Sequence, residues 1–182
     1  METTAEVGRA TIHELRMKFS ELVNLGHVEA PPDYSHSKRI GLFLKRNRGE
    51  FNHVRPEIND ANFPYPSRII KPGDKFLVRV FHYVGRDSHP TMEQQLQFLA
   101  LYNAVHTGPQ GASLVFEQRR GKLPMNTWYA SLDENNQQCA DGTEGIPGLI
   151  RYADGAFCWH LGCFKHLWVN TRAFFCFTEV TV

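Results

Sequence analysis

The chain has 182 residues, with 20 Lys and Arg against 19 Asp and Glu, and its net charge of +1 identifies no class of partner. Thirteen Phe, six Tyr and three Trp supply enough apolar surface to order the chain, which excludes a mainly disordered protein. No stretch approaches the roughly 20 consecutive apolar residues of a transmembrane helix, so we expect no membrane span. This length predicts a single domain over residues 1–182.

The N-terminal residues and the cysteines predict a cytoplasmic protein. Residues 1–7 are polar and acidic, without the basic and apolar regions of a secretory signal. A chain of this size has no need of disulfides, so its cysteines are expected to be free thiols in a reducing compartment. They are Cys139, Cys158, Cys163 and Cys176.

The near-zero net charge hides a gradient along the chain. Residues 1–34 carry a net charge of −3, and residues 87–182 also carry −3. Residues 35–86 hold eleven basic and four acidic residues, a net charge of +7. The middle third is therefore the first place to look for an anionic partner.

An amphipathic helix is predicted for residues 1–26, the first of three parts of the chain. Thr11 and Glu14 form a capping box that starts the helix, and Gly26 can end it in a left-handed conformation. One apolar stripe runs along the helix and needs a partner surface, so the helix is a candidate for docking or homodimerisation. The stripe consists of Ile12, Leu15, Phe19, Leu22 and Val23.

Residues 27–75, the second part, read as an extended arm. Ala30-Pro31-Pro32-Asp33 and Phe63-Pro64-Tyr65-Pro66 are poorly helical, and Ile40–Leu44 is predicted to be one short strand between them. Irregular segments of this length in compact domains are usually functional or partly disordered. We therefore expect this basic segment to contact a partner.

The third part, residues 76–182, is predicted to be a β-rich core. Lys75–Val84 has two largely apolar faces, which is typical of a central strand. Thr91 begins a second capping box and a helix that runs to about His106, where Gly108-Pro109 ends it. Six more strands follow, with a tight turn at Asp154-Gly155: residues 112–118, 127–132, 149–152, 156–161, 164–169 and 173–181.

These elements predict an α+β fold. The sheet is expected to be mainly antiparallel, with about six to seven strands, and it could close into a small barrel. Two helices accompany it, the N-terminal helix and one internal helix.

A cluster of sulfur and imidazole groups makes residues 158–166 a candidate metal site. If Leu161-Gly162 is a turn, Cys158, His160 and Cys163 lie on one side of a hairpin, as three donors that leave one position of a tetrahedral metal open. The alternative is an aromatic hairpin with small buried thiols, and the residue pattern favours it.

Basic residues of the middle third are candidate ligand-binding groups. Phenylalanine and tyrosine residues lie among them, so they could follow a phosphate backbone, although a solvated basic face is favoured over nucleic-acid binding. His82, on the predicted central strand, joins them because a position at the mouth of a site would tune its pKa. The basic candidates are Lys38, Arg39, Lys45, Arg46, Arg48 and Arg55.

No familiar catalytic motif accompanies these candidates. The chain has no nucleophile elbow, phosphate-binding glycine loop or His-Glu-x-x-His sequence. The pattern favours a small cytoplasmic, non-catalytic binding protein that uses segment 35–86. The alternatives are an enzyme with a dispersed or metal-containing site near Cys158, and a nucleic-acid-binding protein. The sequence alone does not decide between them or name a cofactor.

Overall fold

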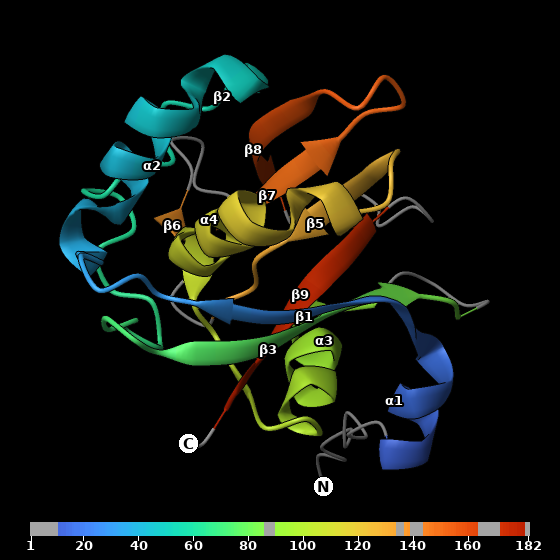
Figure 1. The fold of residues 1–182 in the computed structure, drawn as a ribbon. Helices are drawn as coiled ribbons and strands as arrows, with labels where there is room; N and C mark the ends of the chain where they lie inside the picture. The colour runs from blue at the N-terminus through green and yellow to red at the C-terminus, as the bar shows by residue number, and fades with distance from the viewer. Residues whose placement is uncertain (1–10, 86–89, 134–136, 139–143, 164–171, 181–182) are drawn as a thin grey trace, which may run out of the picture.

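A computed structural model describes residues 11–85, 90–133, 137–138, 144–163 and 172–180 (Figure 1). Its α-helices are α1 (Ile12–Lys18), α2 (Arg39–Asn47), α3 (Met92–Ala100) and α4 (Gly108–Arg119). Short 3-10 helices are η1 (His36–Lys38), η2 (Arg48–Glu50) and η3 (Arg120–Lys122). The strands are β1 (Phe19–Glu29), β2 (Phe51–Val54), β3 (Lys75–Tyr83), β4 (Ala104–Val105), β5 (Thr127–Ala130), β6 (Gln137–Gln138), β7 (Glu144–Arg151), β8 (Phe157–Cys163) and β9 (Arg172–Glu179).

The strands form one mixed sheet, which corrects the predicted fold class. Its order is β1-β3-β9-β5-β7-β8-β2, with β4 beside β9 and β6 beside β7. The β5–β9 and β2–β8 pairs are parallel, and the other pairs are antiparallel. The prediction of a mainly antiparallel sheet with two helices was therefore wrong. The prediction of a barrel was also wrong, because β1 and β2 end the strand order and do not pair with each other in the described structure.

Helices cover both faces of this sheet (Figure 1). On one face, α2 and α4 bury a core with Phe43, Phe116 and Trp159 at its centre. On the other face, α1 and α3 pack over the β1, β3 and β9 side, where Phe98 contacts Phe81 and Phe174. Within the described ranges, none of the helices combines the length and apolar character that a membrane span requires.

The predicted N-terminal helix ends after seven residues, and the chain continues as a strand. The capping box of Thr11 and Glu14 is confirmed. Beyond Lys18 the apolar stripe belongs to β1, which has two bulges: Phe19 packs in the core under α1 and α3, whereas Leu25 and Val28 pack in the core under α2 and α4. Gly26 has the expected positive φ of 79°, but at a bulge and not at a helix end. Homodimerisation through this part of the chain stays a prediction.

The expected strand at Ile40–Leu44 is helix α2, which was a second error. Ile40 and Phe43, three residues apart, are fully buried on one side of this helix. Its first backbone N–H groups are capped from a distance, because Asp60 accepts hydrogen bonds from the N–H groups of Ile40 (2.8 Å) and Gly41 (2.9 Å). Segment 27–75 thus contributes α2, β2 and buried side chains to the fold.

The expected strand at residues 112–118 is helix α4, and Gly108-Pro109 begins this helix instead of ending the previous one. Every residue from Gly108 to Phe116 is buried. Its polar residues Gln110 and Ser113 are buried as well, so the segment has no exposed face by which periodicity could distinguish it from a buried strand. Gly111 permits this packing, since a Cβ there would lie 2.9 Å from the Phe177 ring.

The central strand, the second capping box and the tight turn were predicted correctly. β3 pairs on both sides, the side chain of Thr91 accepts from Gln94, and Gly155 has a φ of 85° in the turn between β7 and β8. The helix that starts after Thr91 ends at Ala100, before the predicted end at His106. The predicted strand at residues 164–169 lies outside the described residues.

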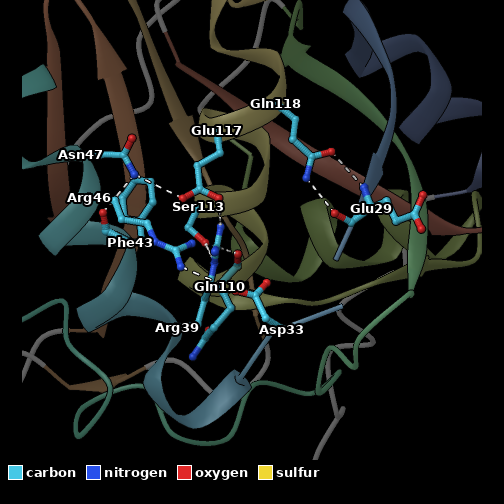
Figure 2. Close-up of polar contacts among 10 residues, drawn as sticks. All are labelled: Glu29, Asp33, Arg39, Phe43, Arg46, Asn47, Gln110, Ser113, Glu117 and Gln118. Carbon is cyan, nitrogen blue, oxygen red and sulfur yellow. Dashed lines mark hydrogen bonds and ion pairs between the residues drawn. The ribbon is translucent and has the colours of Figure 1, made fainter. Parts of the chain in front are cut away.

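Polar side chains of α4 and η3 cover the last part of the β1 edge. The Gln118 amide accepts from the Glu29 N–H (3.0 Å) and donates to the Glu29 carbonyl (2.7 Å), as a neighbouring strand would (Figure 2). Arg119 donates to the His27 carbonyl, and Lys122 donates to the Leu25 carbonyl. These contacts satisfy backbone groups that would otherwise invite pairing with another chain.

Candidate functional site

Arg39, one of the predicted ligand-binding residues, is a buried clamp between α2 and α4. Its Nε donates to Ser113 Oγ (2.7 Å), and its Nη2 donates to Glu117 Oε2 (2.6 Å) (Figure 2). The guanidinium carbon lies 5.3 Å from the centre of the Tyr34 ring. Glu117 is held from a second direction by Asn47 Nδ2 (3.2 Å). The structure therefore uses this cation to join two helices.

The other predicted basic residues lie at the surface, spread over η1, α2, η2 and the residue that follows β2. Arg46 is exposed and pairs with Asp33 at 3.7 Å, and Arg48 donates to the Phe51 carbonyl (3.0 Å). Lys38, Lys45 and Arg55 are also exposed.

His82 is separate from these basic residues. It lies on β3, where its register partners are Ser20 of β1 and Ala173 of β9. Burial lowers the pKa of His82. The predicted set is therefore distributed over several parts of the fold.

One member of that set, Arg55, lies in a concentration of cations at β2 and β8. These two strands are parallel, with His53 opposite Cys158 in the register. The backbone N–H of Arg55 donates to the Trp159 carbonyl (3.0 Å), which continues the pairing past the end of β2. Residues 53 and 55 of the basic segment therefore lie beside residues 158 and 160 of β8.

A tryptophan on β5 supports the same region. Gly148 and Gly162 leave space for the Trp128 indole, because an added Cβ would lie 2.9 Å from Nε1 at position 148 and 2.5 Å from Cζ2 at position 162. The Arg172 guanidinium lies over this indole, 4.6 Å from the ring centre. The His160 ring meets it edge-on, with a centroid distance of 6.2 Å. Trp128 therefore contacts both Arg172 and His160.

His53, Arg55, His160 and Arg172 are named here the cationic cluster. Burial lowers the pKa of His160, and the nearby Arg55, Arg172 and His53 lower it further. Burial also lowers the pKa of Arg172. Strands β2, β5, β7 and β8 contain a single acidic residue, Glu144, at the start of β7. The cluster is therefore a place of positive potential that an anion would stabilise.

The predicted metal donors lie partly in this region. The expected turn at Leu161-Gly162 is absent, because β8 continues to Cys163 and pairs with β7 along its whole length. Cys158 is buried, and burial raises the pKa of its thiol. No group of three or more His, Cys, Asp or Glu in the described part of the chain could hold a metal ion. Since the Cys163 side chain lies outside that part, the site of Cys158, His160 and Cys163 stays a prediction.

Two surface hollows lie elsewhere, around the start of β3, and share Lys75 and Val180. One has a volume of about 320 Å³ and the other about 300 Å³. Arg68 pairs with Asp74 at 2.9 Å and with Glu179 at 2.5 Å, all in the first hollow. Lys75 pairs with Glu29 at 3.4 Å in the second. Because these charges compensate one another, the hollows exert less attraction on a charged ligand than the cationic cluster does.

Sequence reasoning found Arg55 and His160, but it assigned them to two separate sites. It missed His53, Trp128 and Arg172, which become neighbours only through the β2–β8 and β5–β9 pairs. The one available signal was the scarcity of acidic residues in the strands that surround them.

Comparisons with protein-family models, curated proteins and solved structures find no match for the chain.

Proposed function

We propose that the chain is a binding protein that takes a phosphate-bearing anion at the cationic cluster. The observation that carries this proposal is the meeting of Arg55, His53 of β2, His160 of β8 and Arg172 of β9, beside strands β2, β5, β7 and β8, which contain one acidic residue. His160 and Arg172 are half-buried, and an anion bound beside them and the exposed Arg55 would favour their charged forms. Arginine suits phosphate in particular, because its planar fork of N–H groups binds two oxygens at once.

The state of the nearest nucleophilic side chain supports binding over catalysis. A thiol must ionise to attack a substrate, and burial raises the pKa of Cys158. The proposal assigns this protein to the cytoplasm, which agrees with the free thiols of Cys158 and Cys176 among the described residues.

Titration calorimetry with inorganic pyrophosphate at low ionic strength tests the proposal. We expect binding that weakens linearly in log Kd against log salt. Arg55→Ala should weaken it by about ten- to a hundredfold, because a charge-assisted hydrogen bond of about 1.5–3 kcal/mol is lost. Lys71→Ala is the matched control, since Lys71 is exposed in a distant turn. Absence of binding, or equal affinities of these two variants, would show that the cluster is not an anion site.

A further inference from the structure

An exposed aromatic ring lies beside the cationic cluster. Tyr152 follows β7 directly, and 42% of its surface is accessible. Its side chain lies near Cys158, and Cys158 is the register partner of His53. The ring is therefore placed where β7 ends, next to the β8 residues of the cluster. An exposed tyrosine ring offers a flat apolar surface.

Further exposed cations continue from the cluster along the edge of the sheet. β2 is the last strand in the described order, and its four residues span about 13 Å. Arg55 follows one end of β2, and Arg48 precedes the other end, close to Lys45 in the last turn of α2. Glu50 lies in this stretch, but Arg120 partly compensates it at 3.8 Å. The cations thus form a line and not a single point.

Building on the proposed function, we infer that the ligand is a single-stranded nucleic acid. One phosphate lies in the cationic cluster, an adjacent base stacks on Tyr152, and the backbone follows β2 towards Arg48 and Lys45. The combination of a basic track with an aromatic platform is the physical basis of strand binding without sequence preference. A duplex hides the flat faces of its bases, so the tyrosine favours an unpaired strand. An isolated phosphate uses the cluster and gains nothing from the ring.

Fluorescence anisotropy with labelled 12-nucleotide strands of DNA and RNA tests this inference. We expect both strands to bind more tightly than a duplex of the same length or a polyphosphate of the same charge. Tyr152→Ala should weaken strand binding about tenfold, whereas Tyr152→Phe keeps the ring and should stay within about twofold. Neither variant should change pyrophosphate binding, which also shows that each variant is folded. The double variant Lys45→Ala, Arg48→Ala should reduce the slope of log Kd against log salt by about two.

The outcomes separate the two proposals. If Tyr152→Ala binds strands as tightly as the unchanged protein, or if polyphosphate or duplex binds as tightly as a single strand, the inference is wrong. Pyrophosphate binding would then still support the proposed function. If no anion binds at low salt, the proposed function itself is wrong, and the inference is lost with it.

Discussion

Replacing Arg39 by alanine should cost the protein about 3 kcal/mol of its unfolding free energy. The substitution removes the hydrogen bonds to Ser113 and Glu117 and the contact with the Tyr34 ring. Breaking a buried ion pair by removing one partner costs about 3–5 kcal/mol, because the other charge is left uncompensated. Glu117 retains 22% exposure of its side chain, so water and Asn47 can partly solvate it, and the lower end of that range applies. For a chain of this size, the melting temperature should fall by about 6–12 °C.

Urea denaturation followed by fluorescence measures this loss, and Arg46 supplies the control on the same helix. The Arg46–Asp33 pair is exposed, with 54% and 73% of the two side chains accessible and a separation of 3.7 Å. Arg46→Ala should therefore change stability by less than about 0.5 kcal/mol. Equal effects of the two alanine variants would refute the reasoning, since they would show that burial and geometry do not distinguish the two arginines.

Three further predictions concern the Trp128 support, the cap of α2 and the buried histidines. Gly162→Ala should destabilise the protein by about 1–3 kcal/mol and shift the tryptophan fluorescence, because its Cβ would lie 2.5 Å from the Trp128 ring; Gly121→Ala, with open space around it, is the control. Asp60→Ala should cost about 1 kcal/mol in urea denaturation, because two N–H groups of α2 lose their acceptor, and an unchanged midpoint would contradict this role. The unfolding free energy should be highest above about pH 6.5 and fall on acidification, because the unfolded chain takes up protons at a higher pH than the folded chain; a rise between pH 7 and pH 5 would contradict it. Burial is the largest cause of a lowered pKa, relative to the ordinary value of 6.5, in His36, His82 and His160.

Local signals in the sequence predicted those elements whose determinants are local. The capping boxes at Thr11 and Thr91 form as expected, because each needs two side chains within four residues. β3 and the Asp154-Gly155 turn were also predicted correctly, because their sequence signals lie within the segments themselves. The lengths of the helices depend on tertiary contacts. α1 ends at Lys18 because the following residues pair with β3, and no residue near position 19 carries that information.

The two misassigned segments show how tertiary contacts override a local pattern. Ile40–Leu44 is rich in residues that favour strands, yet Asp60, twenty positions later, caps it as a helix. The Gly108–Phe116 segment is enclosed on all sides, and its polar residues Gln110 and Ser113 bind buried partners, so no exposed polar face marks it as a helix. Local patterns also could not predict the mixed sheet, because the parallel β5–β9 and β2–β8 pairs join strands that are distant in the sequence.

The charge profile correctly identified residues 35–86 as basic, but it did not predict where their basic side chains lie in the fold. The structure uses Arg39 to join two helices and Arg68 to bind Asp74 and Glu179, so part of the charge is compensated within the fold. The cationic cluster instead combines Arg55 and His53 from this segment with His160 of β8 and Arg172 of β9. Here the parallel β2–β8 and β5–β9 pairs bring these residues together from strands that are distant in sequence. The components of the cluster contribute little to the charge profile along the chain, so the profile could locate half of the candidate site at most.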